Sequence, residues 1–182
     1  MTNVFIRTGI WPDIIRRGMW EAVRARWIME PIILTIIDAN KYGIREGRAL
    51  AEEAANSDPY IFTDDDVLIV GKNWVKRAVE MVLACPEYGA VSTLSLVETE
   101  NTALPQQDTD IYPMHMVGAP MIIRKGLCLD MPEMTLGSEC GVIYDHMMKQ
   151  GKKQGLIHPK HRIRHNHMGH GFSSNPNLHW GA

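Results

Sequence analysis

The sequence predicts an α/β protein in which helices cover both faces of a largely parallel sheet. Segments with strand-like and helix-like spacing alternate through the first half of the chain. Residues 31–37 form a nearly continuous run of β-branched side chains, which is typical of a strand buried on both faces. Parallel strands need long crossover connections, and a helix of about four turns is the usual one. Together these observations indicate an α/β/α sandwich.

The elements of the first half follow in a regular order. A first strand over 3–7 leads to a helix over 12–27 and then to the strand over 31–37. The next helix spans 44–56, with an apolar stripe on one side and Arg45, Glu46, Arg48, Glu52 and Glu53 largely outside that stripe. A third strand over 60–63 precedes a helix that Asn73 caps and Pro86 ends. Residues 89–94 form a fourth strand.

The second half is less regular. Residues 97–112 are polar without a clear period and indicate a long loop. Residues 116–124 have a strand composition interrupted by Gly118 and Pro120, which favours an edge or a bend. A helix begins at Ser138 and ends near Gly151. Residues 155–163 form a short strand that leads into a tail rich in histidine.

Composition restricts the class of protein. The chain has 182 residues, of which 45% are hydrophobic and 22% charged, and its net charge is −2. We expect one domain over 1–182, made of a first half over about 1–95 and a second half over about 96–182. The balanced charge argues against nucleic acid as a partner. No transmembrane segment or signal peptide is visible. The three widely spaced cysteines fit reduced thiols and therefore a cytoplasmic protein.

A cluster of three carboxylates follows the third strand. In an extended segment Asp64 and Asp66 point to the same face and offer two oxygen ligands to Mg²⁺ or Mn²⁺. The alternative is a solvated acidic turn, which is common. Asp38 and Thr8 end two other predicted strands, and the carboxyl ends of parallel strands meet at one edge where ligands bind. Asp38 has two equally weighted interpretations, a ligand for a base or ribose and a residue that forms a turn.

Further candidate side chains lie in the second half. Glu139 stands in the first turn of the predicted helix, where it either stabilises the positive helix end or acts as a general base. His165 and His167 are two residues apart and face the same way in an extended segment, so a neutral imidazole of either could complete a metal site otherwise made of oxygen atoms.

Taken together, the chain resembles the nucleotide-diphospho-sugar transferase (GT-A) fold, and more specifically family 2-like glycosyltransferases. Four segments carry the resemblance in the family's order: the first strand from Val4 to Thr8, the strand 35–40 containing Asp38, the helix and strand that end in Asp64-Asp65-Asp66, and Gly137-Ser138-Glu139 with the later His165. The DxD context is the most specific of the four.

The resemblance implies a nucleotide-binding half over about 1–95, a half over about 96–182 that completes the acceptor and metal sites, and a role for each matching residue. Thr8 and Asp38 line the nucleotide pocket, Arg48 approaches the diphosphate, and Asp64 and Asp65 lie beside the nucleotide. Asp64 and Asp66 are the DxD pair that binds Mn²⁺ or Mg²⁺, with His165 or His167 as an added ligand. Glu139 falls where the family has its catalytic acidic residue, which acts as the base, although Cys140 stands where the family usually has aspartate.

The implied function is metal-dependent transfer of a sugar from a UDP- or GDP-linked donor to an acceptor hydroxyl on a saccharide, a protein or a small molecule. A nucleotidyltransferase is the second hypothesis. It would need a glycine-rich, basic phosphate loop after the first strand, and residues 6–11 contain one glycine, Gly9, which weakens this hypothesis. The third is a non-catalytic domain that binds a nucleotide-sugar or a partner. A metal-dependent nuclease comes last, since the chain has no basic face.

Overall fold

The computed structural model describes residues 1–8, 32–38, 41–64, 67–71, 73–95, 109–114, 118–134 and 139–167. The strands are β1 Thr2–Thr8, β2 Ile32–Asp38, β3 Tyr60–Asp64, β4 Val67–Val70, β5 Tyr88–Ser95, β6 Ile111–Pro113, β7 Met121–Ile123, β8 Lys153–Ile157 and β9 Arg164–His167. The helices are α3 Ile44–Ala54, α4 Trp74–Ala84, α6 Glu139–Lys149 and the 3₁₀ turn η1 Pro159–His161. The α/β class predicted from the sequence is confirmed.

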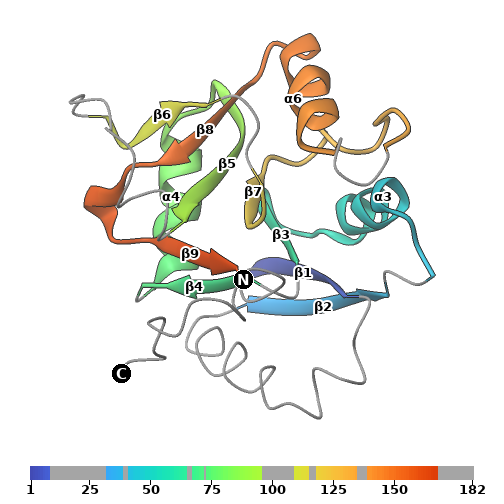
Figure 1. Cartoon of the computed structure of the whole chain (residues 1–182), viewed down its shortest axis with the longest axis horizontal. Coiled ribbons are helices and arrows are strands. Elements are labelled where there is room, and N and C mark those ends of the chain that lie inside the picture. Colours follow the sequence, from blue (N-terminus) through green and yellow to red (C-terminus); the bar gives the residue numbers. More distant parts are fainter. Residues whose placement is uncertain are drawn as a thin grey trace.

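The strands form a mixed sheet in the order β2-β1-β3-β7-β5-β8-β6, and a short ribbon of β4 and β9 branches from β5 (Figure 1). β2, β1, β3, β5 and β8 run in one direction, while β7 and β6 run the opposite way. Both predicted halves of the chain contribute strands to this one sheet.

The helices cover the two faces of the sheet, with α4 on one face and α3 and α6 on the other (Figure 1). Alternating side chains of the central strands divide between two cores. Val4, Ile6 and Ile61 pack with the apolar side of α4, which includes Trp74 and Val82. Side chains of the opposite parity pack with α3 and α6, namely Phe5, Tyr60 and Phe62. The period of two in a strand therefore accounts for both layers.

Two predictions about individual strands are wrong. β7 lies in the middle of the sheet between β3 and β5, not at an edge, because Gly118 and Pro120 precede the strand and leave Met121–Ile123 wholly apolar and buried. β2 is not buried on both faces. It ends the strand order, and most of its residues are half-buried, with Ile33 40% exposed.

Helix boundaries agree closely with the sequence. α4 begins after Asn73 and ends before Pro86, although the Asn73 side chain makes no capping hydrogen bond. α6 is followed by Gly151, whose φ of +70° is the left-handed conformation that favours glycine after a helix. The predicted helix over 12–27, most of the predicted loop over 97–112 and Ser138 lie outside the described residues.

Two charged residues of α3 are buried against the sheet rather than exposed, so their predicted placement outside the apolar stripe is wrong. Glu52 is 1% exposed, and its carboxylate accepts hydrogen bonds from the Tyr60 hydroxyl, from the Cys128 N–H at 3.0 Å and from the Gly126 N–H. Arg48 is 4% exposed, with its guanidinium 4.4 Å from the centre of the Phe62 ring. The hydrogen-bond donors for Glu52 come from a distant segment, so helical periodicity alone does not reveal its burial.

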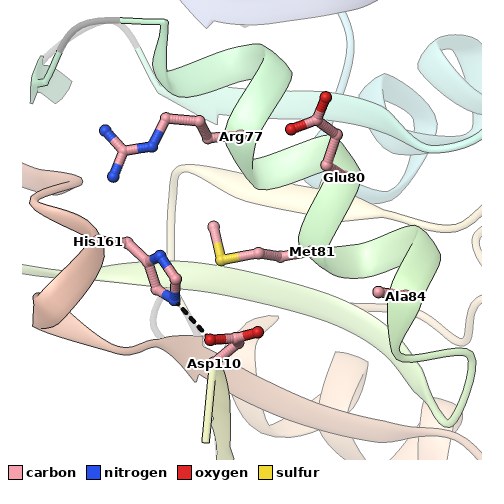
Figure 2. Close-up of a pocket in the computed structure, with 6 residues that line it drawn as sticks. All are labelled: Arg77, Glu80, Met81, Ala84, Asp110 and His161. Carbon is pink, nitrogen blue, oxygen red and sulfur yellow. Dashed lines mark hydrogen bonds and ion pairs between the residues drawn. The ribbon is translucent and has the colours of Figure 1, made fainter.

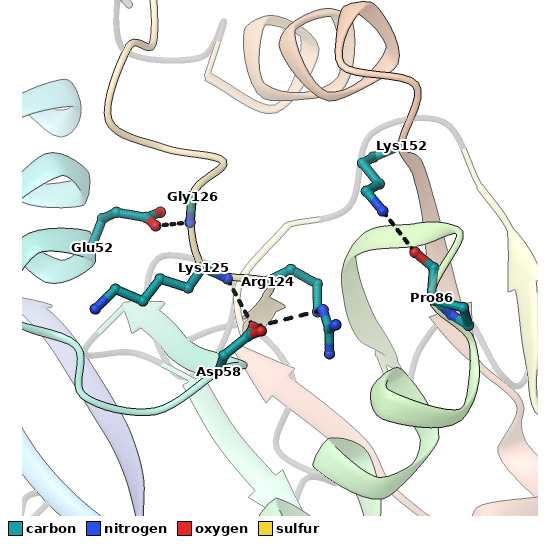
Figure 3. A network of polar contacts seen from close by, with 7 residues as sticks. All are labelled: Glu52, Asp58, Pro86, Arg124, Lys125, Gly126 and Lys152. Atoms are coloured by element: carbon teal, nitrogen blue, oxygen red, sulfur yellow. Dashed lines mark hydrogen bonds and ion pairs between the residues drawn. The ribbon is translucent and has the colours of Figure 1, made fainter.

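The segment that follows β7 is fixed to the region around α3 by several polar contacts (Figure 3). Asp58 accepts a hydrogen bond from the Lys125 N–H at 3.0 Å and lies 3.6 Å from Nε of Arg124. Gly126 donates to Glu52 in the same stretch. In a separate contact, Nζ of Lys152, just before β8, donates to the carbonyl of Pro86, just after α4, at 2.9 Å. Glu52 and Asp58 therefore hold the chain as it leaves the central strand β7.

Within the described part of the chain, no helix is both long enough and apolar enough to cross a membrane.

Candidate functional site

The carboxyl ends of three neighbouring strands bring the predicted polar residues to one edge of the sheet. In the parallel pairing of β1 with β2, Thr8 lies opposite Asp38. In the pairing of β1 with β3, Arg7 lies opposite Asp64. Thr8, Asp38 and Asp64 therefore end three neighbouring strands at the same edge of the sheet, with β1 between β2 and β3, so the predicted convergence of strand ends is confirmed for the backbone.

This edge is also where the chain changes direction across the sheet. After β1 the chain forms β2 on one side, and after β2 it forms β3 on the other side of β1. In open α/β sheets ligands bind outside the carboxyl ends of the strands at such a switch point. Asp64 is half-buried at the end of β3, and Asp38 is exposed at the end of β2. Both carboxylates therefore lie where a ligand of this fold class binds.

The ribbon of β4 and β9 adds a histidine position to the same edge. β4 begins directly after Asp64-Asp65-Asp66, which we call the acidic triplet. In the antiparallel pairing of β4 with β9, Val67 lies opposite His167. The backbone of His167 is therefore across from the residue that follows Asp66. β9 is held in this place from its other side by β5, where Ser95 lies opposite His165. Apolar residues 67–70 carry no helical or alternating period, so the sequence does not predict β4.

His165 has a different environment from an open metal ligand. It is 5% exposed, and its Nδ1 atom lies 2.9 Å from Oγ1 of the buried Thr93. One ring nitrogen is therefore hydrogen-bonded inside the protein, and the ring could coordinate a metal only through Nε2. Of the two predicted histidines, His167 has the backbone position nearer to the acidic triplet.

The residue types predicted for this edge are those that a hard divalent cation prefers. Carboxylate oxygens with one imidazole suit Mn²⁺ and Mg²⁺ or related ions. Asp65 and Asp66 lie outside the described residues, and so do the side chains of Arg7, Thr8 and His167. Among the side chains that the structure describes, no group of three or more His, Cys, Asp or Glu could hold a metal ion. The metal assignment accordingly stays a prediction.

Two further predicted site residues, Glu139 and Arg48, lie on helices. Glu139 is the first residue of α6, and its side chain lies outside the described residues. Arg48 Nη1 lies 3.8 Å from Sδ of Met121 in the buried layer beneath α3. A guanidinium in that layer has no exposed surface to offer a diphosphate, so this packing does not favour the predicted role of Arg48.

A second polar group, not predicted from the sequence, surrounds Asp110 just before β6. The Asp110 carboxylate accepts a hydrogen bond from His161 Nε2 at 2.9 Å and lies 3.1 Å from Lys160 Nζ. Hydrogen bonds from Lys160 and His161 lower the pKa of the Asp110 carboxyl, which is therefore ionised at neutral pH. These residues are far apart in the sequence and meet only because β6 pairs with β8. No spacing rule could have joined them.

Comparison of the sequence with known families and with curated proteins finds no match to either.

Proposed function

We propose that this protein is a metal-dependent glycosyltransferase that uses a nucleotide-diphosphate sugar and has the GT-A architecture. The observation that carries the proposal is the meeting of three features at the carboxyl edge of the sheet. Asp64 ends β3 at the switch point, Asp38 ends β2 beside Thr8, and His167 lies across from the residue after Asp66. Each feature comes from a different part of the chain.

The residues divide into three tasks in this proposal. Asp64, Asp66 and His167 hold a Mn²⁺ or Mg²⁺ ion, which when bound neutralises charge on the diphosphate. Asp38 accepts hydrogen bonds from the base or ribose of UDP or GDP, next to Thr8, and Asp65 lies beside the nucleotide. Glu139, in the first turn of α6, accepts the proton of the acceptor hydroxyl. The residue after Glu139 is Cys140, so Glu139 is the single carboxylate residue in the first turn of α6.

The proposal is tested by isothermal titration of UDP and GDP with and without Mn²⁺. We expect one nucleotide to bind at least tenfold more tightly with Mn²⁺, and we expect Asp66→Asn to abolish that gain. Asp145→Asn, which removes an exposed carboxylate in α6, is the matched control and should bind as the wild type does. Metal-dependent binding that survives in Asp66→Asn would contradict the assignment of this edge.

Turnover distinguishes the enzyme from a binding domain of the same fold. With a panel of UDP- and GDP-sugars and Mn²⁺, the wild type should release nucleoside diphosphate slowly to water even without the acceptor. Glu139→Gln should reduce release while leaving nucleotide binding unchanged. Tight binding without release of product from any donor would favour the non-catalytic alternative.

A further inference from the structure

A hollow of about 300 Å³ lies between α4 and the turn η1, apart from the strand ends (Figure 2). Its volume is at the lower end of the range for sites that bind small molecules. The six residues that line it are Arg77, Glu80, Met81, Ala84, Asp110 and His161. None of them belongs to the proposed transferase site.

The His161 ring is held in a fixed orientation at this hollow. An ionised carboxylate only accepts hydrogen bonds, so Nε2 of His161 carries the proton shared with Asp110. The backbone also fixes the pair, because the His158 N–H donates to the carbonyl of Asp110 at 2.8 Å. The Nδ1 atom of His161 is therefore the ring nitrogen left for a ligand, and in the neutral ring it accepts a hydrogen bond.

Among the residues that the structure describes, one cation at the hollow has no counterion. Asp110 is paired with Lys160 and His161, and Glu80 lies 4.0 Å from Lys76 on the same helix. Arg77 is half-buried, and its backbone N–H donates to the carbonyl of Asn73 at 3.1 Å, but its guanidinium makes no ion pair or hydrogen bond with any residue in the described part of the chain. A guanidinium offers a fork of donors that matches a carboxylate or a phosphate group.

The side chains are arranged around an apolar floor. In Figure 2 the guanidinium of Arg77 lies on the same side of the hollow as the His161 ring, and the Met81 side chain extends from α4 toward that ring. The Glu80 carboxylate lies one turn along α4 from Arg77. A ligand here would meet a cation, a hydrogen-bond acceptor on His161, a carboxylate and a thioether surface.

From this juxtaposition we propose that the hollow binds a small hydroxylated organic anion. Its carboxylate or phosphate group lies against Arg77, one hydroxyl donates to Nδ1 of His161 or to Glu80, and its carbon skeleton covers Met81. The inference does not depend on the transferase proposal, because the two sites share no residue.

The test is an NMR titration of the isotope-labelled full chain with glucuronate, glucose 6-phosphate, glucose and inorganic phosphate. We expect amide signals of α4 and η1 to shift at millimolar glucuronate or glucose 6-phosphate, and to shift little with glucose. The two anionic sugars show whether the site prefers a carboxylate or a phosphate. Asp66→Asn should give the same titration as the wild type, which separates this site from the strand ends.

Two variants, Arg77→Met and Ala84→Leu, and one control, Lys149→Met, decide the role of the hollow. Arg77→Met keeps most of the side-chain bulk and should weaken binding about tenfold or more, which is typical for a lost hydrogen bond to a charged group. Lys149→Met removes one exposed charge from α6 and should leave binding unchanged. Ala84→Leu fills the hollow from an exposed helix position and should block binding without affecting Arg77.

The proposal is overturned if neither anionic sugar shifts the α4 and η1 signals. It is also overturned if Arg77→Met and Lys149→Met weaken binding equally, because the effect would then be one of overall charge. Inorganic phosphate that binds as tightly as glucose 6-phosphate would contradict the part played by His161, Glu80 and Met81.

Discussion

The buried Glu52 and the two strand-end residues Asp38 and Asp64 show how the carboxylate group serves different purposes in this protein. Glu52 lies beneath α3, where it is 1% exposed and accepts hydrogen bonds from three groups of the protein itself. Asp38 and Asp64 end neighbouring strands at the sheet edge, where Asp38 is exposed and Asp64 half-buried. A buried carboxylate needs fixed donors because it has lost its water. We assign a structural role to Glu52, and we propose ligand binding for Asp38 and Asp64 because both lie at the carboxyl ends of strands.

The largest effect expected from this comparison is on stability. Glu52→Ala removes the acceptor from the Tyr60 hydroxyl and from the N–H groups of Gly126 and Cys128. Two buried donors and the partly buried N–H of Gly126, all left without this partner, should lower the free energy of unfolding by about 3 kcal/mol or more. Glu53→Ala, at the next and exposed position of α3, is the control and should change it by less than about 0.5 kcal/mol. Urea unfolding measures the free energy of unfolding of both variants. Equal losses of stability would show that Glu52 does not hold the segment after β7 in place.

A second prediction concerns alkaline pH and the thiol beside Glu52. Burial raises the pKa of Cys128 from its ordinary value of 9.0 to about 11. Between these values the unfolded chain loses the thiol proton while the folded chain keeps it. Stability is therefore fully present below pH 9 and falls as the pH rises toward 11, by about 2 to 3 kcal/mol.

Burial also raises the pKa of Tyr60, which acts in the same direction at higher pH. Unfolding by urea at pH 8 and at pH 10.5 tests the prediction. Cys128→Ala should show a smaller loss between the two pH values than the wild type does. An unchanged loss in that variant would assign the alkaline effect to other groups.

A smaller effect is expected where the β4–β9 ribbon is anchored. Gly71 follows β4 with a φ of +146°, and a Cβ atom there would lie 2.8 Å from the carbonyl oxygen of Arg162, just before β9. Gly71→Ala should cost about 1 to 2 kcal/mol because of the strained backbone and the close contact. If the proposed metal site is correct, the substitution should also weaken Mn²⁺ binding, because the ribbon sets the backbone of His167 opposite Val67.

Gly118→Ala is the matched control for that substitution. A Cβ atom at Gly118 would have no atom of the described residues within 4 Å. The two variants are compared by thermal unfolding and by Mn²⁺ titration. If both leave Mn²⁺ binding at the wild-type value, the β4–β9 ribbon has no part in the metal site.

The sequence predicts local structure well because local structure depends on neighbouring residues. The alternation of strands and helices, the end of α4 before Pro86 and the glycine after α6 all follow from short-range patterns. The meeting of Thr8, Asp38 and Asp64 also follows, because strand ends of a parallel sheet share an edge.

The parts that the sequence does not reveal depend on contacts between distant segments. β4 is a strand because β9 pairs with it, and four apolar residues alone do not specify that. Arg48 and Glu52 look exposed on a helical wheel, yet β7 and the segment after it bury them. The Asp110–His161 pair likewise arises only from the pairing of β6 with β8.

The most direct test of the central claim is pulsed electron paramagnetic resonance of Mn²⁺ bound to the full chain with UDP or GDP. If the strand ends bind the cation together with a nucleotide diphosphate, the spectrum contains coupling to phosphorus and to an imidazole nitrogen. The nitrogen coupling should disappear in His167→Gln, and both couplings should disappear in Asp66→Asn. A spectrum with neither coupling, or one that both variants leave unchanged, would contradict the account.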